Sequence, residues 1–257
     1  PRRCAATRRP HADVDGVAVT SGHGAPLKRD LFGEVRRVIV QADGRVQDCI
    51  QRDTRPAAPG LRWFARRLAA REARALQALR GMQGVPRLVS WDGRQLVRSW
   101  LPGVPMQAAG GVDRAYFREA LRLLRRLHSA GIVHNDLAKE PNWLVTPDGR
   151  PALVDFQLAM RPRYRGRLFR MLAHDDLRHL LKHKRTYCPQ HLTAREREIL
   201  ARRSPLASAW AKTGKPVYRF VTRRLLRWAD REGAGDRGAV QGSTASKSSA
   251  GASPGRK

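Results

Sequence analysis

The sequence predicts an α+β fold, in which an antiparallel sheet with one helix precedes a mainly helical part. Three observations support this prediction. Strand-like runs joined by turn signals fill residues 27–99 apart from one helical stretch, 61–80. A strongly periodic helix follows at residues 114–129. A second hairpin, at residues 143–154, separates this helix from later helical segments.

The composition is that of a folded chain with an unusual charge. The chain has 257 residues, enough for one large domain or two lobes around a real core, and an apolar content of 41%. Its formal net charge is +29, almost all of it from arginine. Such a charge favours an anionic partner, namely nucleic acid, an anionic membrane face or a phosphorylated substrate. A solvated basic surface without a partner is the alternative, and charge alone does not decide between them.

The cysteines and the hydropathy pattern bear on location. Cys4, Cys49 and Cys188 are scattered, with no Cys-x-x-Cys spacing, which argues against a disulfide framework or a zinc site and fits a reducing compartment. No apolar run approaches the length needed to cross a bilayer, and no signal peptide is visible. We therefore expect a cytoplasmic protein. A basic amphipathic helix at residues 218–228 either lies peripherally on the anionic inner face of the membrane or packs on the helical lobe.

The first part of the chain predicts a disordered start followed by antiparallel strands. Residues 1–26 lack a clear period, and we expect them to be mostly disordered apart from a short strand at 17–19. Residues 27–40 predict a strand, a turn and a strand, and residues 46–52 predict the next strand.

The helix at residues 61–80 carries a charged residue on its apolar face. The apolar side chains recur at helical spacing: Phe64, Leu68, Leu76 and Leu79. Glu72 falls on the same stripe by the four-residue period. A carboxylate on a buried face is costly unless it is paired, so Glu72 needs a cationic partner. Several surface arginines of the same helix are one source of that partner.

Two further strands and several helices are predicted downstream. Residues 85–91 and 95–99 are strands joined by an Asp-Gly turn. The helix at 114–129 has an apolar face that consists of Phe117, Ala120, Leu121, Leu124 and Leu127. The later segments are a helix that opens at His174 with Asp175 or Asp176 as its cap, a helix at 193–202 and a disordered tail at 233–257.

The stretch 131–157 gathers oxygen ligands at one place. Two short apolar runs flank the sequence Thr-Pro-Asp-Gly at 146–149, which predicts a hairpin. Asn142 enters at the open end of this hairpin and Asp155 leaves there, so the two become neighbours, and Asp136 precedes Asn142 closely. Two carboxylates and an amide oxygen suit Mg²⁺, which shares the phosphates of its substrate. A surface hairpin with incidental acids is the alternative.

The same stretch resembles the protein-kinase-like superfamily. Its motifs occur in the superfamily's order: His-Asn-Asp-Leu at 134–137, Lys-Glu-Pro-Asn at 139–142 and Asp-Phe-Gln at 155–157, after a kinase-like lead-in at 127–133. Two departures stand out. One extra residue, Ala138, lies between Asp136 and Asn142, and Gln157 replaces the glycine of the third motif, which removes a flexible hinge.

The resemblance implies roles for the residues around the hairpin. Asp136 would orient the acceptor hydroxyl and take its proton. Lys139 would neutralise the charge that develops on the transferred group. Asn142 and Asp155 would hold Mg²⁺ on the phosphates of ATP.

The resemblance extends more weakly into the first lobe. It implies that the nucleotide contacts Gly33, Ile50, Arg52, Glu72 and Leu101. Ile50 would cover the adenine, Leu101 would lie in the hinge between the lobes, and Arg52, fixed by Glu72, would hold the α- and β-phosphates in place of the superfamily's lysine. Two glycines of the phosphate-binding loop are replaced by Lys28 and Asp30, which weakens the interpretation of this loop as a phosphate cradle.

The resemblance also implies a division of the chain. We expect a disordered segment at 1–26, a first lobe at 27–101, a reduced second lobe at 102–232 and a disordered tail at 233–257. An internal stack between the lobes would contain His134, Phe156 and Leu76, with His134 structural rather than catalytic.

Three hypotheses for function follow. The first is an ATP- and Mg²⁺-dependent kinase acting on a hydroxyl group of a protein or an anionic glycolipid. The missing Ala-Pro-Glu segment and the non-glycine third motif resemble bacterial lipopolysaccharide core kinases and small bacterial serine/threonine-kinase-like proteins. The second is a pseudokinase that binds nucleotide or a partner without transfer. The third is a nucleic-acid-binding protein, but no recognisable motif supports it and we expect no specific nucleic acid.

Overall fold

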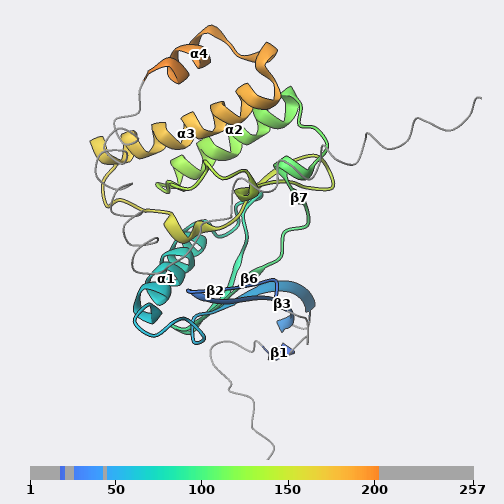
Figure 1. Ribbon diagram of the computed structural model, residues 1–257, viewed down its shortest axis with the longest axis vertical. Helices are drawn as coiled ribbons and strands as arrows, with labels where there is room; N and C mark the ends of the chain where they lie inside the picture. The colour runs from blue at the N-terminus through green and yellow to red at the C-terminus, as the bar shows by residue number, and fades with distance from the viewer. Residues whose placement is uncertain (1–17, 21–25, 43–44, 203–257) are drawn as a thin grey trace, which may run out of the picture. The chain divides into compact units, whose positions relative to one another are not determined.

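An antiparallel sheet and one helix make up the first part of the structure. The computed structural model describes residues 18–20, 26–42 and 45–202, all of them in one compact unit (Figure 1). The predictions for residues 218–228 and 233–257 lie outside the described residues, as do most of those for residues 1–26.

Six strands form this sheet, in the order β1-β3-β4-β6-β5 with β2 paired to β3, and every pair is antiparallel. The strands are β1 (Ala18–Thr20), β2 (Lys28–Asp30), β3 (Gly33–Ala42), β4 (Arg45–Asp53), β5 (Leu88–Trp91) and β6 (Gln95–Ser99). The strands predicted at 27–40, 46–52 and 95–99 are confirmed. The strand predicted at 85–91 begins only at Leu88.

Helix α1 (Arg62–Ala78) lies next to this sheet and buries Glu72, as the four-residue period predicts. Leu68 and Leu76 are also buried. The prediction for Phe64 was wrong, because its side chain is on the exposed side of the helix and contacts Phe32 with ring centroids 5.8 Å apart. Small residues form the rest of the buried face: Ala65, Ala69, Ala73 and Ala75. Their small volume lets the helix approach its neighbours closely.

The second part of the structure consists of helices around a small three-stranded sheet in the order β7-β8-β9. Its elements are β7 (Val104–Pro105), η1 (Met106–Ala108), α2 (Arg114–Ser129), η2 (Glu140–Asn142), β8 (Trp143–Val145), β9 (Pro151–Leu153), η3 (Phe156–Leu158), α3 (Arg167–Tyr187), η4 (Pro189–His191) and α4 (Ala194–Ala201). Helices α2 and α3 run side by side, and α4 follows α3 (Figure 1).

Helix α2 has the predicted bounds and fills the core. The side chain of Asp113 accepts a hydrogen bond from the amide of Tyr116 at 2.8 Å, which caps the first turn. Leu124 and Leu127 are buried as predicted, and Leu123 and Tyr116 join them. One contiguous core links this helix to the end of α1 and to the hairpin of β8 and β9. The hairpin is therefore fixed to the largest apolar cluster of the described residues.

Helix α3 begins earlier than predicted, which changes the role of two acids. It starts at Arg167 after Gly166, because the sequence Arg-Leu-Phe-Arg-Met-Leu-Ala that opens it consists of good helix formers. Asp175 and Asp176 are therefore interior residues, and the prediction that one of them caps the helix was wrong. Helix α4 is confirmed, with the hydroxyl of Thr193 accepting from the amide of Glu196 in a capping box.

Two smaller predictions concern cysteines and membranes. Cys49 and Cys188 are free thiols in buried positions, whereas Cys4 lies outside the described residues. No helix in the described part of the chain has the length and the apolar character that crossing a bilayer requires.

Candidate active site

The open end of the β8–β9 hairpin brings the predicted metal ligands together. Trp143 pairs with Leu153 in the register of the hairpin, and the amide of Val154 donates to the carbonyl of Asn142 at 3.1 Å. Asp155 follows directly, so it leaves the hairpin beside the point where Asn142 enters. The proximity predicted from the turn sequence is confirmed.

Asp136 lies at the centre of a small polar cluster. Its Oδ2 accepts from Asn142 Nδ2 at 3.0 Å and lies 3.1 Å from Lys139 Nζ. Asn142 Nδ2 also donates to the backbone carbonyl of Asp136 at 2.8 Å. The carboxylate of Asp136 is 14% exposed, while the side chain of Lys139 is 63% exposed. The cluster therefore places a carboxylate beside a cation, both reachable from solvent, although Ala138 lengthens the loop by one residue.

Asp155 has a backbone and an environment that set it apart from ordinary aspartates. Its φ of 64° lies in the left-handed region, which a residue with a Cβ rarely adopts. Its Oδ1 accepts from Gln157 Nε2 at 2.6 Å. Burial alone would raise the pKa of Asp155, but Arg52, the Gln157 hydrogen bond, Lys139 and His134 together lower the pKa below its usual range. Asp155 is thus held as a carboxylate, and the residue that replaces the motif's glycine contributes to this.

The donor chemistry of this cluster fits Mg²⁺ bound together with a phosphate. Asn142 uses its amide nitrogen on Asp136, which leaves its Oδ1 as a neutral oxygen ligand, and Asp155 supplies an ionised carboxylate. These are hard oxygen donors of the kind that Mg²⁺ prefers. In the part of the chain that the structure describes, no group of three or more His, Cys, Asp or Glu side chains could hold a metal alone. A cation here would therefore need further oxygens from a bound ligand.

Asp176 anchors the loop that carries Asp136. Its Oδ2 accepts from the amide of His134 at 2.7 Å, and its Oδ1 accepts from the amide of Asn135 at 2.9 Å. Its Oδ2 also lies 3.2 Å from His128 Nε2, so a side chain of α2 contacts Asp176 as well. Asn135 has a φ of 62°, and the two backbone bonds hold it in this strained left-handed conformation. Asp176 is 1% exposed, so these bonds are sheltered from water.

Two further residues of α3 hold the same loop. His183 Nε2 lies 2.8 Å from the carbonyl of Leu137, and Tyr187 Oη donates to Glu140 Oε2 at 2.9 Å. Positions 176, 183 and 187 lie seven and four residues apart, so they share one face of the helix. Helix α3 is therefore the support of the catalytic loop. The sequence analysis missed all three contacts, because each joins residues more than 40 positions apart.

His134 is structural, as predicted. Its side chain is fully buried, and its Nε2 lies 3.0 Å from the carbonyl oxygen of Val154, which can only accept, so Nε2 carries the proton. Burial lowers the pKa of His134 and keeps the ring neutral, against the opposing effect of Asp176 and other nearby acids. The ring packs on Phe156 with centroids 4.6 Å apart. Leu76, Phe156 and the catalytic-loop residue Leu137 belong to one core, in which α1 meets η3.

Glu72 has two cationic partners. Its Oε2 lies 3.6 Å from Arg52 Nε, which confirms the predicted pair, and its Oε1 lies closer, 3.2 Å, to Arg98 Nε. Among the ion pairs of the described residues, none joins Glu72 to a surface arginine of α1. Burial raises the pKa of Glu72 despite both arginines, and burial lowers the pKa of Arg98. The sequence analysis missed Arg98, although strand alternation places it on the same sheet face as Arg52.

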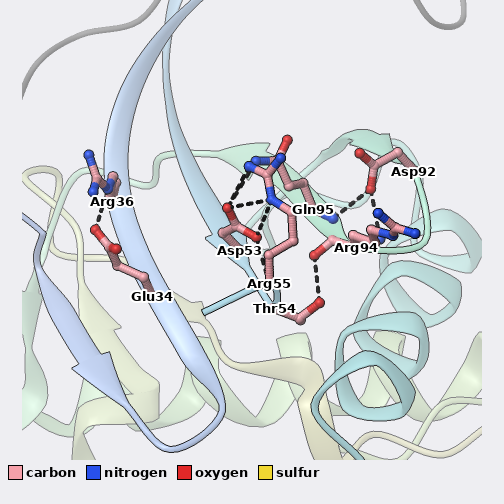
Figure 2. Close-up of polar contacts among 8 residues, drawn as sticks. All are labelled: Glu34, Arg36, Asp53, Thr54, Arg55, Asp92, Arg94 and Gln95. Carbon is pink, nitrogen blue, oxygen red and sulfur yellow. Dashed lines mark hydrogen bonds and ion pairs between the residues drawn. The ribbon is translucent and has the colours of Figure 1, made fainter. Parts of the chain in front are cut away.

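The end of strand β4, which carries Arg52, is fixed by a polar network (Figure 2). Asp53 accepts from the backbone amide and the guanidinium of Arg55 and from Gln95 Nε2, the last at 3.1 Å. Thr54 Oγ1 donates to the carbonyl of Arg94 at 2.8 Å, which ties this end to the turn between β5 and β6. The chain is therefore fixed directly after position 52.

The turn between β2 and β3, which was predicted to be the phosphate loop, requires Gly33 for a structural reason. Gly33 has a φ of 127°, and a Cβ built on it would lie 2.1 Å from the carbonyl oxygen of Asp53. The carboxylate of Asp30 accepts from the amide of Phe32 at 2.8 Å, and the carbonyl of Leu31 accepts from the amide of Ala58 at 3.1 Å. Within the turn, the amide of Phe32 is therefore already bonded to the carboxylate of Asp30. The bond from Ala58 ties the turn to the segment before α1. Its form does not require a phosphate.

The other residues predicted to contact the nucleotide lie on the same sheet and after it. Ile50 is 3% exposed and pairs with Arg98 in the register of β4 and β6. Leu101 is half-buried in the connection between β6 and β7. A groove of about 900 Å³ lies away from these residues, between α2 and the tip of the β8–β9 hairpin. Arg122, Arg126 and Arg150 are among the residues that line it. No predicted site residue contributes to that groove.

An antiparallel sheet with one helix, followed by helices and a hairpin whose open end brings Asn142 and Asp155 beside the loop of Asp136, defines a protein-kinase-like fold. The crystal structure of the Rio2 kinase from Chaetomium thermophilum is similar, with a TM-score of 0.51 and 16% identity over 76% of this chain and 68% of that chain. The Rio2 kinase–ADP/Mg²⁺–phosphoaspartate complex from the same organism has a TM-score of 0.48 and 16% identity over 78% and 67%. The predicted α+β kinase-like fold is confirmed.

The family can be named as well. The model of the RIO domain family matches residues 41–197, more than half of the chain. The chain belongs to the RIO domain family, which places it within the protein-kinase-like superfamily. No curated protein matches the chain. The narrower resemblance to lipopolysaccharide core kinases is not shown by these similarities.

Proposed function

We propose that this chain is an ATP- and Mg²⁺-dependent phosphotransferase that transfers the γ-phosphate to a hydroxyl group of a protein or an anionic glycolipid. The observation that carries the proposal is the cluster at the open end of the hairpin. There, Asp136 contacts both Lys139 and Asn142, and the ionised Asp155 leaves the hairpin beside Asn142. RIO domain membership and the resemblance of the kinase motifs agree with it.

In this proposal the two sides of the site have different tasks. Asn142 Oδ1 and the Asp155 carboxylate would hold Mg²⁺, which would neutralise charge on the phosphates, while ATP would supply the phosphoryl group. Arg52 holds the nucleotide phosphates. The Rio2 kinase from Chaetomium thermophilum forms a complex with ADP and Mg²⁺. Ile50 and Leu101 contact the base, and Gly33 contributes by shaping the turn between β2 and β3.

Asp136 positions the acceptor and receives its proton. The contacts of its side chain with Asn142 and Lys139 both go to Oδ2, so Oδ1 is the oxygen that accepts the hydroxyl proton. Lys139 lies close enough to stabilise negative charge on the group in transfer, because its ammonium is 3.1 Å from Asp136. Catalysis in such a site rests on positioning and on charge neutralisation.

The basic segment after η3 bears on the acceptor. The connection from Ala159 to Gly166 is short, and it carries exposed arginines at 161, 163 and 165. Such a connection offers charge for a phosphate-bearing acceptor and little surface for a bound peptide. We place the protein in the cytoplasm, with peripheral contact to an anionic membrane face if the acceptor is a glycolipid.

The test is a transfer experiment with γ-labelled ATP, Mg²⁺ and cell extract that is afterwards split into protein and lipid fractions. Asp136→Asn serves as the inactive control. Label in one fraction that depends on the wild-type enzyme supports the proposal and identifies the acceptor class. If neither fraction gains label beyond the Asp136→Asn control while MgADP binds, the pseudokinase alternative replaces the proposal.

One observation favours that alternative. The turn where kinases place a phosphate-binding loop carries the carboxylate of Asp30, which occupies the amide of Phe32 at 2.8 Å. A carboxylate at this place repels phosphate rather than binding it. Substitution of Asp30 by Gly separates the two hypotheses, because either protein should gain affinity for ATP but only an active enzyme should transfer the phosphoryl group.

A further inference from the structure

Arg98 is a buried cation that the kinase motifs do not explain. Its side chain is 13% exposed, and its Nε lies 3.2 Å from Glu72 Oε1, closer than Arg52 is to the other oxygen. A buried guanidinium is costly to desolvate, so its position calls for a specific interaction. The contact with Glu72 is the ion pair that the structure describes for it.

The register of the sheet places the two arginines beside each other. Arg98 pairs with Ile50 across strands β6 and β4, and Arg52 pairs with Leu96. Ile50 and Arg52 share a face because side chains alternate, so Arg98 lies on that face as well. Glu72 reaches this face from α1 with a fully buried side chain. One carboxylate therefore lies between two guanidinium groups from neighbouring strands.

We propose that Arg98 is a positioning residue that occupies Glu72 so that Arg52 can act on the nucleotide phosphates. A single buried carboxylate and a single arginine tend to close into a two-point ion pair that uses both oxygens. Here Arg98 is the closer cation, on the Oε1 side of Glu72, and Arg52 faces Oε2 at a looser 3.6 Å. Neither oxygen of Glu72 has a hydrogen-bond partner, so the carboxylate acts on both arginines through charge. The contact of Arg52 with Glu72 is made through Nε, which leaves the terminal nitrogens of Arg52 for another anion.

The electrostatics of the site agree with this arrangement. Arg52 is the group that lowers the pKa of Asp155 most strongly against the effect of burial. Glu72, Arg98 and Arg52 also influence one another, so the four side chains form one network with two positive and two negative charges. Within it, the charge of Arg52 acts on Asp155 as well as on Glu72. Without Arg98, Glu72 would draw Arg52 towards α1 and away from Asp155.

The inference rests on the proposed nucleotide binding, and binding measurements test it without any transfer step. MgADP and adenosine affinities are measured by calorimetry for the wild type, Arg98→Met, Arg52→Met and the double variant. Adenosine lacks phosphates, so it reports on the base site alone. We expect Arg98→Met to weaken MgADP binding about tenfold, equivalent to about 1.4 kcal/mol, and adenosine binding less than about twofold. When Arg52→Met is already present, adding Arg98→Met should not weaken MgADP binding further.

Two more variants keep the test decisive. Arg98→Lys preserves the charge and should keep MgADP affinity within about threefold, even if Arg98→Met fails to fold. Arg94→Met, in the turn before β6, is the matched control and should change neither affinity.

Different results would overturn the inference in different ways. Equal loss of adenosine and MgADP in Arg98→Met would show a merely structural residue. A further loss of MgADP in the Arg52→Met background would show that Arg98 contacts phosphate directly. No MgADP binding to the wild type would end both this inference and the proposed function, whereas missing transfer with the expected binding pattern would end only the proposed function.

Discussion

The two sides of the candidate site are built from different interactions. The catalytic loop is held by hydrogen bonds from one face of α3, in which the buried Asp176 binds two backbone amides and His183 binds the carbonyl of Leu137. The phosphate side is held by charge, with Glu72 between Arg52 and Arg98. The catalytic loop keeps the residues of the kinase motifs, whereas the phosphate side has Arg52 in place of the superfamily's lysine.

This difference shows which part of a kinase-like site tolerates change. Proton transfer needs a carboxylate at a defined place, so the loop around Asp136 is fixed by directional bonds. Holding a phosphate needs positive charge with less strict geometry, so we expect that Arg52 can take the place of the superfamily's lysine. The comparison makes four predictions, each for a change on one side.

The largest effect is expected on the catalytic side, at Asp136. Asp136→Asn removes the base but keeps the shape of the side chain and its contact with Asn142. Transfer should fall by about 10²–10⁴-fold, the range that a general base contributes, while MgADP affinity stays within about threefold. Single-turnover transfer and calorimetry measure the two quantities. An equal loss of both in a folded variant would contradict the assigned role.

The support of the loop should be sensitive at Asp176. Asp176→Asn replaces one accepting oxygen by a donor and leaves a backbone amide of His134 or Asn135 unpaired in a buried place. The free energy of unfolding should fall by about 2–4 kcal/mol, measured by denaturant titration. Asp175→Asn, one position earlier on α3, is the control and should change it by less than about 1 kcal/mol. Similar values for both variants would remove Asp176 from the support of the loop.

On the phosphate side, Gly33→Ala should act through stability. The new Cβ would meet the carbonyl of Asp53 at 2.1 Å, and the φ of 127° is strained for alanine. We expect a loss of about 1–3 kcal/mol. Gly93→Ala is the matched control, because Gly93 has a φ of 88° with nothing within 4 Å of its Cβ, so it reports the backbone strain alone. If the control loses as much, the close approach to Asp53 is not what requires Gly33.

The fourth prediction is a pH dependence of stability on the α3 side. Burial lowers the pKa values of His134, His179 and His183, so the unfolded chain binds their protons before the folded chain does. Their stabilising contribution is complete above the unfolded pKa of about 6.5 and is lost as the pH falls below it. Each histidine contributes at most about 1.4 kcal/mol per pH unit. Denaturant titrations at pH 7.5, 6.5 and 5.5 check the slope, and a flat profile would contradict it.

The sequence predicted the local features of this protein well. The bounds of α2 follow from its apolar period, and the proximity of Asn142 and Asp155 follows from one turn sequence. The Arg52–Glu72 pair was predicted from a resemblance and from the cost of a buried acid. In these cases the decisive residues are close in sequence or are joined by a known motif.

The features that were missed depend on distant parts of the chain. Arg98 reaches Glu72 only because of the register of β4 and β6, which no local pattern specifies. Asp175 or Asp176 was predicted to cap a helix that opens at His174, because aspartate is common at caps, but the helix begins earlier, at Arg167. Phe64 was assigned to the buried face because the apolar stripe of α1 was drawn through its large residues. The buried face consists largely of alanines, which the prediction left out.

The most direct test of the account is the effect of Mg²⁺ on ADP affinity, compared between the wild type, Asp155→Asn and Asp148→Asn. Asp155 lies at the open end of the hairpin, and Asp148 lies exposed in its turn at the closed end. We predict that Mg²⁺ raises ADP affinity at least about tenfold in the wild type and in Asp148→Asn, and that Asp155→Asn loses this gain. An ADP affinity that does not depend on Mg²⁺, or a gain that survives in Asp155→Asn, would contradict the assignment of this site.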